Sequence, residues 1–395
     1  MKATSGAHFI ALDHVRAVAV LLVFVWHFTH GPQGYPVPFE GSPMWGPLVL
    51  FDEGHVGVSL FMTLSGYLFA KLLEGRQVKY HLFLWNRILR LSPLFIVVML
   101  VNAVSKAVDA GDVRVGYWFL LSLPRGFVLP SWPNGAWSIA VELHFYLLLP
   151  LLLFLQKRTS LWLGLVLTLT LSYRTHLFVE HGEVQSLAYW TIVGRLDQFI
   201  LGILAFNARR FFTHAHLKIA LVLIIFISIY YWFDKQGGFY LFDGYPSASP
   251  IWIVLPTLEG IAFASAIAWY ETSFSQRGGV ISDALSKIGE YSFSIYLLHV
   301  FVVFHAANWI HTHVLDISNF YVALPVALLV FAPMIPVGYV SMKLIEQPFL
   351  RLRRPYYVKN DTAADGVSGQ CHANGQNAHT HSVSSEPVVA AYVER

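Results

Sequence analysis

The sequence predicts an all-α fold: a polytopic integral membrane helix bundle of about ten transmembrane helices, with both termini in the cytosol. Three observations lead to this prediction: the composition, the lengths of the apolar stretches, and the distribution of lysine and arginine between alternate loops. Of the 395 residues, 56% are hydrophobic and 12% are charged. Because soluble domains contain about 25% charged residues, most of this chain is predicted to face lipid or protein rather than water.

The apolar stretches set the expected helices. A helix that crosses about 30 Å of hydrocarbon needs roughly 20 mostly apolar residues. Stretches of this kind are predicted at 9–30, 52–73, 91–107, 137–156, 160–178, 190–206, 217–234, 250–270, 289–312 and 321–345. The apolar segment 118–123 is short and is followed by Pro124, so we expect it in a re-entrant or interfacial loop.

The first stretch, Phe9–Phe28, also has the position of a secretory signal peptide. It contains Arg16 and His27, and no small-x-small cleavage site follows it. Both features are foreign to the apolar core of a signal peptide. The stretch is therefore predicted to be an uncleaved first membrane helix.

Lysine and arginine divide unequally between alternate loops, and cytosolic loops are the ones enriched in these residues. The richer side holds Lys2, Lys71, Arg76, Lys79, Arg87, Arg90, Lys157, Arg158, Arg209, Arg210, Lys218, Arg277, Lys287, Lys343, Arg351, Arg353, Arg354 and Lys359. The opposite loops hold Lys106, Arg114, Arg125, Arg174 and Lys235. Both termini therefore fall on the cytosolic side, which requires an even number of crossings.

The chain is predicted to contain one transmembrane domain, residues 1–355, and a disordered cytosolic tail, residues 356–395. From about Asp361 the composition shifts to Ala, Gly, Ser, Asn and His, which cannot bury a core. Cys371 is the single cysteine, and no metal-ligand spacing is present, so no metal is expected. A net charge of +3 is too small to predict nucleic-acid binding.

The first helix carries Arg16 and His27 at a separation of three helical turns, so the two side chains share a face, about 16 Å apart along the axis. Ionisable side chains within a membrane helix usually mark a functional cavity. The alternatives are structural: an ion pair between Arg16 and Asp13 one turn away, and a packing role for His27.

The segment Trp137–Glu142 opens the fourth stretch. Ser138 is placed to act as a helix N-cap or as a hydroxyl donor. A lone carboxylate one turn into an apolar helix needs a cation or a proton. Glu142 is therefore predicted to pair with His27 or Arg16, to anchor a substrate, or to form a structural salt bridge.

Arg87 and Arg90 precede the third stretch at a spacing that places them on one helical face. Guanidinium groups bind phosphate bidentately, so the pair suits a phosphorylated ligand. The alternative is simple anchoring at the cytosolic surface.

Small residues recur within the second stretch, from Gly57 to Tyr67. Close helix packing explains Gly57 and Gly66. Arg195 and Asp197 flank the sixth stretch, and His299 lies well inside the ninth. For His299, packing and chemistry are both open.

Taken in order, these motifs resemble the membrane-bound acyltransferase-3 family, which includes bacterial O-antigen, Nod-factor and glucan O-acyltransferases. The resemblance extends from Leu12 to about Arg351. It rests on Leu12-Asp13 followed by Arg16-x10-His27, the stretch from Gly57 to Tyr67, Arg87 and Arg90 before Pro93, Trp137-Ser138-x3-Glu142 with Phe145, Tyr146 and Pro150, Arg195-x-Asp197-x-Phe199 with Gly202, the segment Tyr291 to His299, and Glu346-x-Pro348.

The resemblance implies transfer of an acyl group, with acetyl expected, from cytosolic acyl-coenzyme A to a hydroxyl of a cell-surface or exported glycan, or of a lipid-linked saccharide, at the bacterial inner membrane. No bound cofactor is expected. His27 is implied as general base or as transient acyl carrier, with Glu142 orienting it or holding the acceptor and Arg16 steering the donor. The implied donor-binding residues are Arg87, Arg90, Ser65 and Tyr67. The implied acceptor or supporting residues are Asp13, Trp137, Ser138, Arg195, Asp197, Tyr296 and His299.

A membrane transporter or proton-coupled exporter is the rival interpretation, because buried charges can also relay protons. No inverted repeat is visible in the sequence, and the Arg16 to His27 spacing matches the acyltransferases. The oligomeric state is not predicted.

Overall fold

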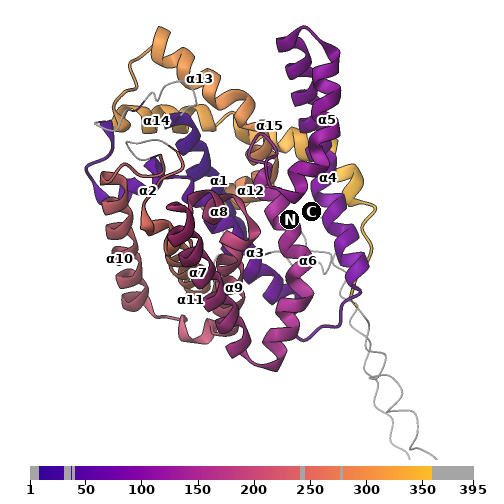
Figure 1. Ribbon diagram of the computed structural model, residues 1–395, viewed down its shortest axis with the longest axis vertical. Helices are drawn as coiled ribbons and strands as arrows, with labels where there is room; N and C mark the ends of the chain where they lie inside the picture. The colour runs from indigo at the N-terminus through magenta and orange to yellow at the C-terminus, as the bar shows by residue number, and fades with distance from the viewer. Residues whose placement is uncertain (1–8, 31–36, 38–40, 241–244, 276–278, 358–395) are drawn as a thin grey trace, which may run out of the picture. The chain divides into compact units, whose positions relative to one another are not determined.

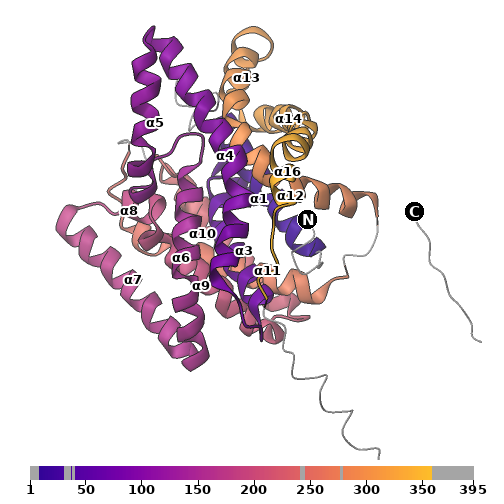
Figure 2. The same ribbon diagram turned by 90° about the vertical axis from the view of Figure 1, so that its right-hand side faces the viewer.

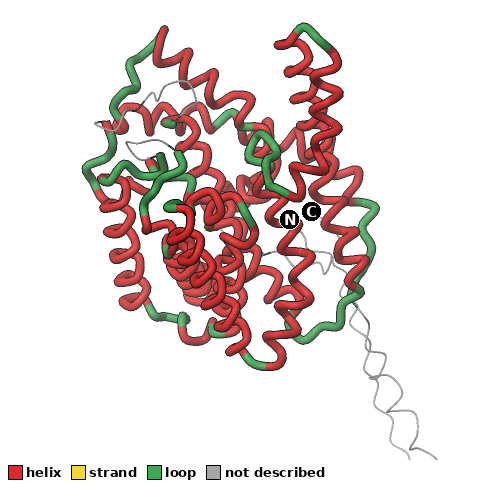
Figure 3. The backbone as a smooth tube through the Cα atoms, viewed as in Figure 1, coloured by secondary structure: helices red, strands yellow, loops and turns green. Residues whose placement is uncertain are grey.

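A computed structural model describes residues 9–30, 37, 41–240, 245–275 and 279–357. Helices and connecting loops make up this part of the chain (Figure 3), and an isolated bridge between Val78 and Tyr357 is its only β pairing. The predicted all-α class is confirmed. The helices are α1 (Ile10–Thr29), α2 (Val49–Asp52), α3 (Val56–Leu73), α4 (Tyr80–Ala110), α5 (Val113–Val128), α6 (Trp137–Arg158), α7 (Ser160–His181), α8 (Gln185–Trp190), α9 (Ile192–Asn207), α10 (His216–Lys235), α11 (Leu255–Ser273), α12 (Val280–Leu298), α13 (Val300–His313), α14 (Phe320–Phe331), α15 (Met334–Ser341) and α16 (Gln347–Leu350). Short 3₁₀ turns lie at η2 (Gly46–Leu48), η3 (Arg209–Phe211) and η4 (Pro250–Ile253), and η5 (Met342–Glu346) is a π-helical turn.

Every predicted apolar stretch coincides with a helix or a run of helices. Within the described residues, six are long and apolar enough to cross a membrane: α1, α3, α4, α6, α10 and the run Phe320–Leu350. Helices α12 and α13 qualify together but meet at 75°, which is the geometry of a broken span or a re-entrant loop. Helix α9 has only 16 residues, short of the roughly 20 that a bilayer requires. The count of ten crossings and the side of the termini therefore remain predictions.

Residues 118–123, expected in a loop, belong instead to helix α5. Gly111, at a φ of 61°, ends α4, and the Asp112 side chain caps α5 by accepting a hydrogen bond of 2.9 Å from the Arg114 amide. The two helices form an antiparallel hairpin, with α5 folding back beside the end of α4 (Figures 1 and 2). The expectation of a loop overlooked Gly111, which ends α4, and Asp112, which begins α5.

Helix α1 occupies the middle of the bundle, in contact with α3, α12, α13 and α14 (Figure 1). Helices α3 and α9 approach closely through glycine. A Cβ on Gly66 would lie 2.0 Å from the Phe199 carbonyl oxygen, and one on Gly202 would lie 2.1 Å from that of Thr63. The predicted packing role of Gly66 is confirmed, and the close crossing brings α3 side chains against the centre of the bundle.

The chain after α16 returns along α4 (Figure 2). The side chain of Asn86 bonds the backbone of Arg354 twice, at 2.7 and 3.0 Å, and the Lys79 amide donates to the Tyr356 carbonyl at 2.8 Å. Tyr356 is fully buried. The compact unit thus continues through Tyr357, beyond the predicted boundary at 355, and residues 358–395, where the tail was predicted, lie outside the described residues.

Candidate active site

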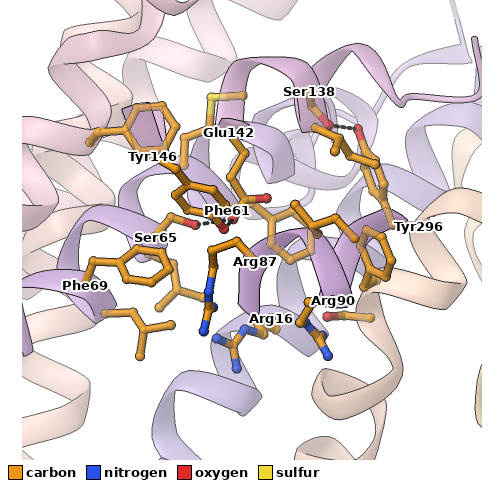
Figure 4. A pocket seen from close by; sticks show the side chains of 18 of the residues that line it. Arg16, Phe61, Ser65, Phe69, Arg87, Arg90, Ser138, Glu142, Tyr146 and Tyr296 are labelled. Carbon is orange, nitrogen blue, oxygen red and sulfur yellow. Dashed lines mark hydrogen bonds between the residues drawn. The ribbon is translucent and has the colours of Figure 1, made fainter. Parts of the chain in front are cut away.

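A pocket enters the bundle between α1, α3, α4, α6 and α12, with the C-terminal return segment as a further wall. Apolar side chains of α3, among them Phe61, Met62 and Phe69, line its length. Figure 4 shows its polarity: the guanidinium groups of Arg16, Arg87 and Arg90 gather at one end, and the Ser138–Tyr296 pair lies at the other. We refer to these as the arginine end and the hydroxyl end.

The arginine end carries more positive charge than its neighbours neutralise. Arg16 donates a short hydrogen bond to Asp13, the ion pair that the sequence analysis gave as the structural alternative for Arg16. The Nη1 atom of Arg90 lies 3.9 Å from a Glu346 carboxylate oxygen. Arg87 has no carboxylate within 4.0 Å among the described residues, and its guanidinium lies 5.3 Å from the centre of the Phe69 ring. This end can therefore hold an anion.

Glu142 faces the middle of the pocket, half-buried. Its Oε1 atom accepts hydrogen bonds from the Ser65 hydroxyl at 3.3 Å and from the Tyr146 hydroxyl (Figure 4). In the described part of the chain, neither His27 nor Arg16 bonds to it. The role in which Glu142 orients His27 through direct contact thus has no support in the geometry, and its place in the pocket fits the role of a substrate anchor.

The hydroxyl end is built from two helices. Ser138 donates to the Gly135 carbonyl at 2.9 Å and shares a hydrogen bond of 2.9 Å with the Tyr296 hydroxyl. The N-cap of α6 is Ala136, so Ser138 is the hydroxyl donor and not the cap. Gly135, at a φ of 73°, lets the backbone approach the Tyr296 ring, which a Cβ would meet at 3.0 Å.

His27 lies beyond the hydroxyl end, in the last turn of α1, and does not line the pocket. His299 links the two places. Its Nδ1 atom is 2.5 Å from the Tyr296 carbonyl oxygen, its Nε2 atom is 3.3 Å from His27 Nδ1, and its ring centre is 5.8 Å from that of Tyr296. The fold thus brings His27, His299 and Tyr296 together. Their spacing in the sequence did not indicate this grouping.

These contacts assign the neutral tautomers of both histidines. A carbonyl oxygen only accepts, so His299 Nδ1 carries a hydrogen and its Nε2 carries a lone pair. His27 Nδ1 lies 2.8 Å from the Val23 carbonyl and therefore also carries a hydrogen, which is shared with His299 Nε2. The Nε2 atom of His27 is left with the lone pair that a general base needs.

Besides His27 and His299, four predicted site residues lie away from the pocket walls. The Tyr67 hydroxyl donates to Glu271 at 2.6 Å. Trp137 packs against the rings of Tyr189 and Trp190, at 5.1 and 4.5 Å between centres. Arg195 and Asp197 are buried in polar networks, described next, rather than at a cavity.

The Arg195 network is closed on itself. The Arg195 guanidinium donates to Ser59 at 2.8 Å, to Gln198 at 3.1 Å and to a backbone carbonyl. Glu259 accepts from Ser59 at 2.5 Å, from Gln198 at 2.8 Å and from the Tyr230 hydroxyl. Sequence reasoning missed Glu259, although a carboxylate inside the predicted stretch 250–270 is the same signal that drew attention to Glu142.

Asp197 belongs to a neighbouring network with Arg174. Both side chains are fully buried, 2.7 Å apart, and the Thr257 hydroxyl completes the group at 2.5 Å from Asp197. Arg174 had been placed in a loop by the sequence, and lies within α7.

A further buried polar group surrounds the start of α3. The Glu53 carboxylate lies 3.1 Å from His55, and Asp52 lies 3.8 Å from His30. Burial raises the pKa of Glu53 to about 8 and that of Asp52 to about 7, with each carboxylate repelled by its acidic neighbours. Sequence analysis did not single out this group, because the two carboxylates stand at the edge of an apolar stretch.

Comparison with known proteins identifies the family. Residues 9–342 match the acyltransferase domain. The chain is 27% identical over 216 residues to the peptidoglycan O-acetyltransferase OatA of Listeria monocytogenes, covering 47% of this chain and 32% of that protein. It is 24% identical over 350 residues to a putative O-acetyltransferase of Staphylococcus aureus, covering 77% and 52%. It is 28% identical over 164 residues to the putative peptidoglycan O-acetyltransferase YrhL of Bacillus subtilis, covering 36% and 23%.

The chain thus spans about half, or less, of the length of the relatives it matches. No solved structure matches it significantly. The domain match, however, covers nearly all of the described helices and includes both ends of the pocket as far as Tyr296. This chain belongs to the membrane-bound acyltransferase-3 family.

Proposed function

We propose that this chain is an integral membrane O-acyltransferase that moves an acyl group, expected to be acetyl, from cytosolic acyl-coenzyme A to a hydroxyl of a cell-surface or exported glycan. The observation that carries the proposal is the polarity of the pocket. Unneutralised arginines stand at one end, an apolar wall follows, and the hydroxyl end leads through His299 to His27. Relatives named peptidoglycan O-acetyltransferases support a glycan acceptor.

The donor end fits a phosphorylated carrier. Arg87 and Arg90 would hold its phosphates, which guanidinium groups bind with charge-assisted hydrogen bonds. The thioester arm would run along the apolar side chains of α3, where water is scarce. Because lysine and arginine dominate the loops on this side, the proposal places the arginine end at the cytosolic face of a bacterial inner membrane, with both termini on the same side.

In the proposed chemistry, His27 Nε2 takes the proton of an acceptor hydroxyl as its oxygen attacks the thioester carbonyl. A carbon–oxygen bond forms, the carbon–sulfur bond breaks, and the departing thiolate receives a proton to leave as coenzyme A. The Ser138 and Tyr296 hydroxyls, which stand between the two substrates, would donate to the carbonyl oxygen as negative charge develops there. Glu142 would anchor a substrate in the pocket.

A second order of steps uses the same residues: His27 first accepts the acyl group and then passes it to the hydroxyl. Rapid acid quenching of a single turnover separates the two. An acyl group covalently attached to His27 supports the carrier route, and its absence at every time point supports the general-base route.

The test of function uses the full chain in lipid nanodiscs with acetyl-coenzyme A labelled on the acetyl group and a bacterial glycan extract. We expect label in alkali-labile ester on the glycan and an equal amount of free coenzyme A. His27→Ala should reduce both by at least about a hundredfold, the usual loss for a general base. His176→Ala is the matched control, because His176 is exposed on α7 and does not line the pocket.

Equal ester formation by wild type and His27→Ala would overturn the proposal. Accumulation of labelled donor inside sealed vesicles, without ester, would favour the transporter in its place.

A further inference from the structure

The C-terminal return segment contributes an arginine to the pocket. Arg353 lines the arginine end together with Arg16, Arg87 and Arg90. It lies beyond residue 342, where the match to the acyltransferase domain ends. Nothing in its sequence context distinguishes it from Arg351 and Arg354, which are exposed.

The return segment is held in place rather than resting on the surface. The two hydrogen bonds between the Asn86 side chain and the Arg354 backbone fix the residue next to Arg353. The Lys79 amide bonds the Tyr356 carbonyl, and Tyr356 is fully buried at the pocket wall. These contacts on both sides limit where the Arg353 side chain can go, so its position in the pocket is preorganised.

The positive charge of Arg353 is not neutralised by a neighbouring carboxylate among the described residues. Among the described residues, no carboxylate lies within 4.0 Å of it, and its Nε atom is buried without a hydrogen-bond partner. The same holds for Nε of Arg87. Burial lowers the pKa of Arg353, and the nearby charges of Arg90 and Arg87 lower it further. Arginine remains protonated at neutral pH even so. Three neighbouring cations therefore share the single carboxylate of Glu346, 3.9 Å from Arg90, and a bound anion would relieve the free-energy cost of this arrangement.

We propose that Arg353 is a phosphate-binding residue of the donor site, and that it acts with Arg87 and Arg90 on a donor that carries more than one phosphate group. The inference rests on the proposed function and sharpens it. A single phosphate needs only one guanidinium group to form a bidentate pair of hydrogen bonds. Three guanidinium groups from α4 and the return segment match a carrier with a diphosphate and a separate phosphate, as coenzyme A has.

The test measures binding without turnover, using isothermal titration of the purified full chain in detergent micelles with coenzyme A, dephospho-coenzyme A and pantetheine. Arg353→Gln should weaken coenzyme A binding about tenfold or more, the usual value of a charge-assisted hydrogen bond. Arg353→Lys, which keeps the charge without the fork, should lose less. Arg351→Gln and Arg354→Gln remove the same charge from exposed positions of the same segment and should leave affinity unchanged.

Comparison of the three ligands shows which phosphate group of coenzyme A Arg353 contacts. Pantetheine lacks phosphate, so Arg353→Gln should not alter its binding. If Arg353 contacts the separate phosphate, wild type and Arg353→Gln should bind dephospho-coenzyme A equally. If it contacts the diphosphate, the variant should lose affinity for both nucleotide ligands.

Unchanged coenzyme A binding by Arg353→Gln, with a loss in Arg87→Gln, would overturn the role of Arg353 and leave the proposed function standing. An equal loss in Arg351→Gln or Arg354→Gln would reduce the effect to general charge and also overturn it. A wild-type protein that binds no coenzyme A would overturn the donor assignment itself. Thermal unfolding of Arg353→Gln at the wild-type temperature excludes misfolding as the cause of lost binding.

Discussion

Two regions of this bundle hold arginine away from bulk water, and they differ in how completely its hydrogen bonds are matched. Around Arg195, the guanidinium meets two side chains and a backbone carbonyl, and nearby Glu259 accepts three hydrogen bonds. At the arginine end of the pocket, Arg87 and Arg353 have buried Nε atoms without partners. The first arrangement is matched by internal partners, whereas the second leaves guanidinium atoms without a partner among the described residues.

The difference teaches that burial of a charge does not by itself mark a functional site. An intramembrane arginine is costly wherever it lies, and the cost can be offset by neighbouring side chains or by a substrate. Arg195 and Asp197 resemble site residues in the sequence, yet their partners are all internal. Arg174 also has a buried Nε without a partner, so an unmatched atom is informative only beside a cavity. Arg87 and Arg353 combine unmatched atoms with a place in the pocket wall.

The largest expected effect comes from opening the closed network. Glu259→Ala removes the acceptor of three hydrogen bonds and leaves Arg195 with an uncompensated buried charge, so we expect a loss of about 3–5 kcal/mol in the free energy of unfolding. Thermal unfolding in detergent measures it. Glu259→Gln keeps an acceptor and should lose less. A Glu259→Ala protein as stable as wild type would contradict the structural role of this network.

The arginine end should respond in the opposite way. Arg87→Gln removes a charge that has no internal partner, so stability should hardly change, while the KM for acyl-coenzyme A rises about ten- to a hundredfold. Steady-state kinetics on the nanodisc preparation measures this. Arg210→Gln, at an exposed position in η3, is the control. A large loss of stability with unchanged KM would show that Arg87 has a structural role. The arginine end would then not differ from the Arg195 network.

A smaller effect is expected where the pocket meets His27. His299→Ala removes the acceptor of the His27 Nδ1 hydrogen and leaves the Val23 carbonyl to hold the ring, so kcat should fall about tenfold with KM for the donor unchanged. His299→Gln supplies an amide oxygen as acceptor and should recover part of the rate. If the two variants fall equally, or KM changes instead of kcat, His299 does not position His27.

The most gradual effect, spread over several pH units, concerns the carboxylates before α3, which are buried but only partly matched. The folded-state pKa of Glu53 is raised to about 8, so the folded protein binds more protons than the unfolded chain between about pH 4.5 and 8. The contribution of Glu53 to the free energy of unfolding should therefore be fully present below about pH 4.5 and be lost as pH rises to about 8. The decline is at most about 1.4 kcal/mol per pH unit for one group. Asp52, whose pKa is raised to about 7, adds a decline of its own.

Glu53→Gln should flatten this decline, because the amide does not titrate. Unfolding temperatures from pH 5 to 8 provide the measurement, and Glu180→Gln, exposed on α7, is the control. A slope that is unchanged in Glu53→Gln would place the titrating group elsewhere.

The sequence by itself determined the class of protein, the places of its helices and many of the costly charges. Hydrophobicity over about 20 residues is a local property, so each predicted stretch found its helix, and the pairing of Arg16 with Asp13 lies within one helical turn. Small residues at Gly57 and Gly66 indicated close helix packing from the sequence alone. The arginines of α4 were recognisable because their spacing places them on one face.

Only the tertiary structure decided which charges meet. His299 contacts His27 across 272 residues, and Glu142 contacts Ser65 across 77. Arg353 reaches the pocket because Asn86, 268 residues before Arg354, holds the return segment. These partnerships depend on how distant helices pack, and no local periodicity encodes them. The sequence therefore shows which side chains are expensive to bury, and the packing shows which of them still lack a partner.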